Sequence, residues 1–407
     1  MVITVLDIGT STVKTLIATL EDENTINLRG VGESSKHKMF KSKITDVEST
    51  VAAIKDSMLK AEVMAGIKPD NLFASIGGIE TKGITGKGTI ALPKQNSVIT
   101  ENDVLRAINQ SKVMSIGDNP IIHVIERNFT VDTQENIKNP VGLIGSKLLC
   151  ETMVITIPSL IIQNYSNVIE RAGYRVEDYV SQHIAASYSV LSEEEKELGV
   201  ALIDIGGGTT KITVFTDSVI REIDTIEIGG ANITKDISIG LRLTSNDSEN
   251  VKKKYGSCIK DNLNPDEKFK VKGLTDNDER EIGSLELYEI IAPRVDELIE
   301  FIQQSLASSQ LFDKLNAGIV LTGGTANLKG IKERFERKMN IPAKIGYPKL
   351  NVGMSEQIKD PSFAVACGIL EYITPKFLTK GYSGKKRMNI SGSFSKMFET
   401  IKDLFKL

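Results

Sequence analysis

Residues 5–14 read VLDIGTSTVK, and residues 202–211 read LIDIGGGTTK. Both stretches spell D-I-G-x-x-T-x-K, and each follows an apolar run that contains β-branched residues. A strand that meets a tight glycine turn presents successive backbone N–H groups, and such a nest binds phosphate oxygens. Because nearly half the chain separates the copies, the repeat predicts two similar domains that close on one nucleotide. The alternative for either copy alone is an ordinary hairpin with a capped turn.

The two turns supply the predicted phosphate ligands. Glycine permits the positive φ angles of a nest, and threonine hydroxyls add donors. The predicted residues are Gly9, Thr10, Ser11, Thr12 and Lys14 in the first copy, and Gly206, Gly207, Gly208, Thr209, Thr210 and Lys211 in the second. Asp7 and Asp204 suit Mg²⁺, which takes one or two carboxylates and keeps most of its waters. We expect these two carboxylates to face each other across a cleft.

A third glycine loop follows in the stretch IVLTGGTANLKGI at 319–331. An apolar strand, a glycine pair and a helix start place helix N-terminal amides next to an anion or a sugar. Such a loop alone is weak support, because strand–helix turns often use glycine. The loop supports a nucleotide site because it follows the two D-I-G motifs in the chain.

This order of motifs is similar to that of the actin/hexokinase/DnaK-type ATPase superfamily. Within it the chain resembles the FtsA family of bacterial cell-division proteins, in the stretches KNPVGLIGSKL, AASYSVLSEEEKELGVALIDIGGGTTKITVF and AGIVLTGGTANLKGI. The resemblance covers about residues 3–375 and resumes at the C-terminal helix. It implies ATP and Mg²⁺ as ligands and an α/β actin-like fold. That fold has two similar domains, each with a mixed five-stranded sheet flanked by helices, an inserted α+β subdomain, and a C-terminal amphipathic helix.

The chain is expected to divide accordingly. The first domain core takes 1–80, 158–196 and 355–378, the inserted subdomain 81–157, the second core 197–228 and 290–354, its outer subdomain 229–289, a flexible linker 379–392, and the amphipathic helix 393–407. Residues 245–290 are highly charged and predicted to be rich in loops, with Lys252, Lys253 and Lys254 on a helix. A helix over 285–306 is expected to be interrupted near Pro293.

The resemblance also assigns roles at the nucleotide. Gly323 and Gly324, with Ala326 and Asn327, are similar to the adenosine loop. Glu249 and Lys252 match a pair that borders the ribose and base, and their i, i+3 spacing puts them on one helix face. The alternative for this pair is a solvated salt bridge.

Two further positions carry weaker expectations. Gln182 occupies the place where relatives have a water-orienting Gln or Glu. Because a neutral Gln is a poor general base, hydrolysis should be slow, with ATP acting mainly as an assembly ligand. Arg280 matches a basic position bordering the docking site for the tail of FtsZ, the tubulin-like division GTPase; the alternative is an ordinary surface arginine.

The final stretch, SFSKMFETIKDLFKL at 393–407, has a helical apolar period. One face would carry Phe394, Met397, Phe398, Ile401, Leu404 and Phe405. From Lys376 onward there are eight Lys and Arg residues and two acidic ones, in a chain of net charge −3. A cationic amphipathic helix on a flexible linker predicts an anchor to anionic lipid, weak in one copy and strong in an array. The alternative is a helix docked on its own core or in a partner's groove.

Composition excludes other classes. The chain has no Trp and no net positive charge, which disfavours nucleic-acid binding. Its three cysteines are far apart, so neither a disulfide framework nor a zinc site is expected. The resemblance to the FtsA family, together with the predicted tail, implies a protein on the cytoplasmic membrane face at the division site. It would polymerise head-to-tail, tether the FtsZ ring and recruit other division proteins through the inserted subdomain. The alternatives are an FtsA-like pilus-assembly ATPase and a small-molecule kinase of the same superfamily.

Overall fold

The computed structural model describes residues 1–22, 25–35, 39–113, 119–261, 263–273, 279–349 and 356–379. The predicted membrane-binding segment 393–407, with the apolar face from Phe394 to Phe405, lies outside the described residues. The predicted linker beyond Thr379 does so too. No described helix is long and apolar enough to span a membrane.

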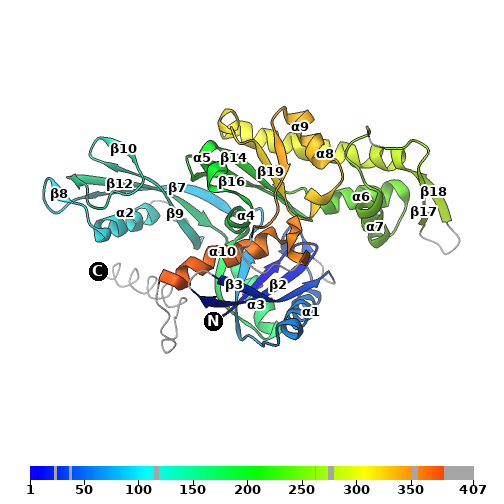
Figure 1. Cartoon of the computed structure of the whole chain (residues 1–407), viewed down its shortest axis with the longest axis horizontal. Helices are drawn as coiled ribbons and strands as arrows, with labels where there is room; N and C mark the ends of the chain where they lie inside the picture. The colour runs from blue at the N-terminus through cyan, green and yellow to red at the C-terminus, as the bar shows by residue number, and fades with distance from the viewer. Residues whose placement is uncertain are drawn as a thin grey trace.

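Two lobes of the same topology form the body of the molecule (Figure 1). The first sheet has the order β13-β6-β1-β2-β3, and the second has the order β16-β15-β14-β19-β20. In each, a three-stranded antiparallel meander continues into two parallel strands. The first-lobe strands are β1 Val2–Ile8, β2 Val13–Asp22, β3 Thr25–Ser34, β6 Asn71–Ile76 and β13 Arg175–Ser181. Those of the second are β14 Val200–Ile205, β15 Thr210–Thr216, β16 Val219–Ile226, β19 Ile319–Thr322 and β20 Ala343–Ile345.

The strand alternation decides which helices cover each sheet. In β1, Leu6 and Ile8 pack with α1 (Val47–Ala65) and α3 (Ser159–Ala172), whereas Ile3 and Val5 face the opposite side. In β14, Ile203 and Ile205 pack under the second-lobe helices, whereas Val200 and Leu202 face the first lobe. Those helices are α6 Gly230–Leu241, α7 Ser245–Tyr255, α8 Ser284–Ser308 and α9 Ile331–Met339.

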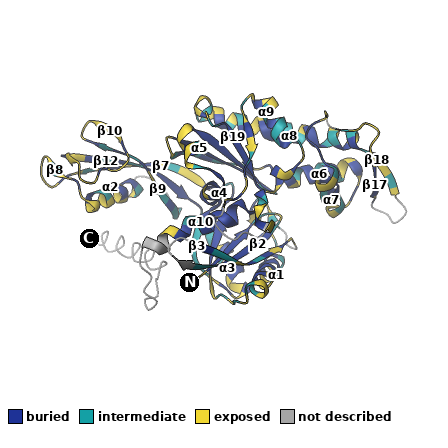
Figure 2. Cartoon of the chain, viewed as in Figure 1, coloured by how far each residue is buried: buried dark blue, intermediate teal, exposed yellow. Residues whose placement is uncertain are grey.

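Two helices lie between the lobes, namely α4 (Gln182–Val190) and α10 (Ala364–Thr379) (Figure 1). They share one buried core with residues of both sheets. Their backbones cross closely, because a Cβ at Gly368 would stand 1.7 Å from the Ala185 carbonyl oxygen. Figure 2 shows this continuous buried interior. The two lobes therefore share one packed core around α4 and α10.

An α+β unit projects from one side of the body, as Figure 1 shows. Its sheet has the order β10-β9-β12-β7, and α2 packs on it. The elements are β7 Lys82–Ala91, α2 Glu101–Val113, β9 Ile121–Val131, β10 Gln134–Ile137 and β12 Lys147–Thr156, with a small ladder of β8 Ser97–Val98 and β11 Ile144–Gly145.

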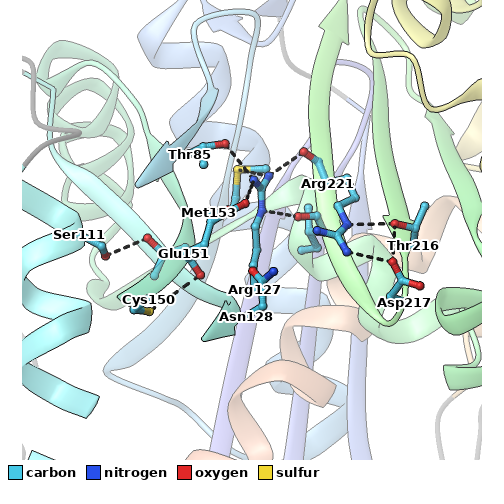
Figure 3. A network of polar contacts seen from close by, with 12 residues as sticks. Thr85, Ser111, Arg127, Asn128, Cys150, Glu151, Met153, Thr216, Asp217 and Arg221 are labelled. Carbon is cyan, nitrogen blue, oxygen red and sulfur yellow. Dashed lines mark hydrogen bonds and ion pairs between the residues drawn. The ribbon is translucent and has the colours of Figure 1, made fainter. Parts of the chain in front are cut away.

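Arg127 of β9 fixes this unit to the second lobe (Figure 3). Its guanidinium donates to the backbone carbonyls of Ile220 at 2.8 Å and Arg221 at 2.6 Å, both on β16. It also donates to Thr85 Oγ1 within the unit at 2.8 Å and lies 3.4 Å from Glu151. Separating the α+β unit from the second lobe would leave the buried guanidinium without its β16 acceptors. Because an unsatisfied buried donor is costly, these bonds stabilise the contact.

Two expectations about the second lobe were wrong. The described part of the charged region 245–290 contains α7, which is the helix expected around Lys252, but it is not rich in loops, because it also contains the hairpin of β17 (Lys268–Lys272) and β18 (Glu279–Gly283). Helix α8 also runs uninterrupted through Pro293. A proline removes one backbone donor, and the buried side chains of Ile291 and Val295 on either side hold the helix against the sheet.

Candidate nucleotide site

The two D-I-G-x-x-T-x-K copies adopt the same local structure. In the first hairpin Asp7 pairs with Lys14, and in the second Asp204 pairs with Lys211. Each turn is closed by a bond from the first glycine to the threonine three residues later, 3.0 Å in both Gly9 N–Thr12 O and Gly206 N–Thr209 O. The repeat in sequence is therefore a repeat in backbone geometry, with one copy at the inner edge of each lobe.

Both turns open into one cavity of about 870 Å³ between the lobes. Pockets for small molecules span about 300–1,000 Å³, so a nucleotide fits. The predicted ligand residues that line it are Asp7, Gly9, Thr10, Ser11, Thr12, Lys14, Gln182, Asp204, Gly206, Gly207, Thr209, Lys211, Glu249, Lys252, Gly324 and Asn327. Residues from every predicted nucleotide motif thus converge on a single cleft.

Four predicted ligands do not line this cavity: Gly208, Thr210, Gly323 and Ala326. The hydroxyl of Thr210 donates to the Ile228 carbonyl at 2.8 Å, so the expectation that it serves as a phosphate donor was wrong. Strand alternation turns this side chain inward, away from the turn. Gly208 packs against Thr10 of the opposite turn, and Ala326 is buried.

Gly323 supports the site from behind. Its φ is +84°, a conformation that favours glycine, and a Cβ there would stand 2.4 Å from Asp204 Oδ1. The third glycine loop therefore packs directly against the carboxylate of the second D-I-G motif. This contact explains why glycine is required at a position that does not face the cavity.

The second phosphate turn is held with its carbonyl groups toward α6. Gly206 O accepts from Gly230 N at 2.9 Å and Gly207 O accepts from Ala231 N at 2.7 Å. Thr325 Oγ1 also donates to Gly206 O at 3.1 Å. Thr325 was not among the site residues predicted from the sequence, although it lies inside the TGGTAN loop at 322–327.

Asp7 is almost fully buried, and burial raises its pKa, opposed by a hydrogen bond from Ser75 and by the charges of Lys14 and Lys211. Ser75 Oγ donates to Asp7 Oδ1 at 2.6 Å. Asp204 lies 3.5 Å from Lys211 Nζ. Since a bound cation would relieve the cost of burying Asp7, the two carboxylates fit Mg²⁺. The described residues include no cluster of three metal-ligating side chains, so water and phosphate would complete the shell.

Gln182 lies at the start of α4 and lines the cavity. Its Nε2 donates to Ser75 Oγ at 3.3 Å, which links it to Asp7. Its Oε1 is buried and accepts no hydrogen bond from any described residue. This oxygen therefore keeps an unused capacity to accept a hydrogen bond, for example from a water. Sequence reasoning missed Ser75, whose signal is a polar residue inside the apolar strand NLFASI.

Glu249 and Lys252 of α7 line the cavity, as do Asn327 and Leu328. Lys252 is buried, so the alternative of a solvated salt bridge was wrong. Its ammonium donates to Gly230 O at 3.0 Å, Thr234 Oγ1 at 2.8 Å and Glu249 Oε2 at 2.6 Å. These bonds use all three of its protons. Lys252 therefore positions Glu249, which is left as the acceptor for a ligand.

Arg280 lies on β18 and does not line the cavity. Its Nε and Nη2 atoms are enclosed and have no hydrogen-bond partner in the described part of the chain. The proposed docking role of this residue stays a prediction.

Known proteins resemble this chain along most of its length. The family profile "Cell division protein FtsA" matches residues 201–368, and "SHS2 domain inserted in FTSA" matches residues 78–156. The chain is 32% identical to the cell division protein FtsA of Pseudomonas aeruginosa over 389 residues, which cover 95% of this chain and 92% of the relative. The FtsA of Neisseria meningitidis is 35% identical over 371 residues, 90% of this chain and 89% of that one.

The chain belongs to the FtsA family of cell division proteins.

Solved structures show the shared fold beyond that family. A chain of the PilM–PilN type IV pilus biogenesis complex superposes with a TM-score of 0.63 at 16% identity, over 91% of this chain and 98% of that one. MreB5 of Spiroplasma citri bound to ADP superposes with a TM-score of 0.54 at 15% identity, over 94% and 99% of the two chains. The FtsA family membership and the actin-like fold predicted from the motifs are thus confirmed.

Proposed function

We propose that this FtsA-family protein binds ATP and Mg²⁺ between its lobes. We further propose that it uses the nucleotide to assemble head-to-tail on the cytoplasmic face of the membrane at the division site. The observation that carries the proposal is the convergence of both phosphate turns on one cavity. The turns and the carboxylates come from different lobes, so a ligand that touches both favours one arrangement of the lobes.

Different residues of the cavity would bind different parts of Mg-ATP. The backbone amides of the Gly9–Thr12 and Gly206–Thr209 turns would hold the phosphates, and Asp7 and Asp204 would hold the metal ion through water. Glu249 would accept from the ribose. Bound Mg²⁺ neutralises phosphate charge. The carbonyl oxygen of Gln182 would orient a water, and without a strong base hydrolysis is slow, so the nucleotide serves mainly as an assembly ligand.

Membrane attachment rests on the sequence of the last fifteen residues. The apolar face from Phe394 to Phe405 and the positive charge around it suit anionic lipid. We further propose that the tail of FtsZ docks near Arg280 and that the inserted unit contacts other division proteins. These contacts would link a cytoskeletal ring to the membrane.

Electron microscopy on an anionic lipid monolayer tests the proposal. The full chain with ATP and Mg²⁺ is expected to form filaments on the lipid, whereas a variant ending at Gly392 binds ATP but leaves the lipid bare. A matched variant is the full chain with Phe398 and Phe405 changed to Ser. This variant keeps the length and charge of the tail and removes two side chains of its apolar face. Lipid binding by the truncated chain would contradict the anchor, and filaments that are equally abundant without nucleotide would contradict the assembly role.

A further inference from the structure

A short hairpin brings one more residue to the cleft. Strands β4 (Met39–Phe40) and β5 (Lys43–Ile44) pair antiparallel, and Lys41 and Ser42 form the turn between them. Their φ angles are +49° and +63°. A two-residue turn with both φ angles positive favours Asn-Gly or Gly-Gly, and other residues are disfavoured there. Residues other than glycine carry backbone strain at such positions, and strain of this kind often clusters at functional sites.

Ser42 lies where the two phosphate turns meet. Its backbone N–H donates to Thr10 Oγ1 of the first turn at 3.3 Å, and its hydroxyl lies 3.2 Å from Thr209 Oγ1 of the second. Its carbonyl accepts from the buried hydroxyl of Tyr165 at 3.2 Å. Both of its backbone groups are therefore engaged, and its side chain lines the cavity.

The hydroxyl pair has a donor to spare. Ser42 and Thr209 each carry one hydroxyl hydrogen, and the bond between them uses only one. Within the described residues, neither hydroxyl has a second acceptor. One hydrogen at the junction of the turns is thus free for an acceptor that enters the cavity. Glu249 and Asn327 are expected at the nucleoside and the two turns at the phosphates, so an acceptor at the junction of the turns would belong to the outermost phosphate.

Lys41 ties the same hairpin to the opposite lobe. Its ammonium forms an ion pair with Glu227, just beyond the end of β16. Its backbone N also stands 3.1 Å from where a Cβ of Gly208 would be, so the turn rests on the second phosphate turn. The hairpin therefore spans the cleft at its phosphate end.

We propose that this hairpin is a further nucleotide-binding element, in which Ser42 donates to the terminal phosphate of a nucleoside triphosphate and Lys41 straps the hairpin across the cleft. The inference rests on the proposed ATP-binding function. Ser42 would then distinguish triphosphate from diphosphate, because only the triphosphate reaches the junction of the turns.

Equilibrium binding of fluorescent ATP and ADP analogues with Mg²⁺ tests this role. In Ser42→Ala and Ser42→Gly, ATP should bind about tenfold more weakly, as expected for losing a hydrogen bond to a charged group, while ADP affinity stays within about twofold. Glycine suits the turn, so that variant keeps the hairpin without the hydroxyl. Ser308→Ala, at an exposed helix end, is the matched control.

The outcomes are separable. If both Ser42 variants keep the ratio of ATP to ADP affinity of the unmodified chain, the inference about Ser42 is overturned and the proposed ATP binding still stands. The same holds if Ser42→Gly binds ATP normally while Ser42→Ala does not. If the unmodified chain binds neither analogue, the proposed function itself fails. For the strap, Lys41→Glu should release both nucleotides about two- to fivefold faster, since exposed ion pairs contribute modestly. Adding Glu227→Lys should restore the rate, and no restoration would refute the pairing.

Discussion

Gly323→Ala should destabilise the fold and weaken metal-dependent binding, because the new methyl group would displace the carboxylate of Asp204. At φ +84° and ψ +167°, a backbone region that is essentially restricted to glycine, an alanine costs about 1–3 kcal/mol in backbone strain. The new Cβ would also stand 2.4 Å from Asp204 Oδ1 and 2.7 Å from the Ile205 carbonyl oxygen, and relieving such overlap costs about 1–3 kcal/mol more. We expect the free energy of unfolding to fall by about 2–6 kcal/mol, the sum of these two costs.

The displaced carboxylate should also weaken metal-dependent binding. Moving a group that supports a metal typically costs about tenfold in affinity, so Mg-ATP should bind about tenfold more weakly while metal-free ATP is nearly unaffected. The measurements are urea unfolding without nucleotide, and calorimetric titration of ATP with Mg²⁺ or with a chelator.

Gly142→Ala is the matched control for this prediction. Gly142 also has a positive φ, +89°, and nothing lies within 4 Å of its would-be Cβ, so an alanine there is strained without making a contact. It should lose only about 1–2 kcal/mol and bind Mg-ATP normally. If the two variants lose equal stability, or if Gly323→Ala leaves the effect of Mg²⁺ intact, then the contact with Asp204 has no consequence and the reasoning is refuted.

Three further predictions concern Lys252, His183 and Arg127. Lys252→Met should remove the ion pair with the partly exposed Glu249 and the donor to the Gly230 carbonyl, although Thr234 and Lys253 still contact Glu249. We expect the free energy of unfolding to fall by about 1–3 kcal/mol and ATP binding to weaken; unchanged affinity in equilibrium dialysis would refute the positioning role of Lys252. Burial lowers the pKa of His183 to about 4, so the contribution of this residue to the free energy of unfolding is complete above about pH 6.5 and is lost as pH falls. At pH 5 the chain should therefore be about 2 kcal/mol less stable than at pH 8. Urea unfolding of His183→Gln should show a flatter dependence of stability on pH. Arg127→Gln should cost about 3 kcal/mol in urea unfolding, because β16 carbonyls lose their donors, whereas Arg175→Gln at an exposed position should cost almost nothing.

The repeated motif predicted two similar domains with similar turns, and the family resemblance implied the fold of both lobes. The same eight-residue pattern gives the same strand register in each copy, so a sequence repeat becomes a structural repeat. Local signals of this kind, strand then glycine turn then strand, depend on neighbours in the chain. They also brought Asp7 and Asp204 correctly to one cavity.

What the sequence did not reveal depends on long-range contacts. Ser75 is 68 residues from the Asp7 carboxylate that it holds, and Arg127 is 93 residues from the carbonyl of Ile220. No periodicity marks either residue. The expected break at Pro293 and the expected ligand role of Thr210 failed for a related reason, because packing of the surrounding core decided both outcomes.

The central claim is that the cleft binds ATP through a metal ion held from both lobes. Calorimetric titration of ATP into the full chain and into Asp204→Ala, each with and without Mg²⁺, tests it directly, with exposed Asp313→Ala as control. We predict that the unmodified chain and the control bind ATP, and that removing Mg²⁺ or the Asp204 carboxylate weakens binding about tenfold, without a further loss when both are removed. Equal affinity in all four titrations, or no binding by the unmodified chain, would contradict the account.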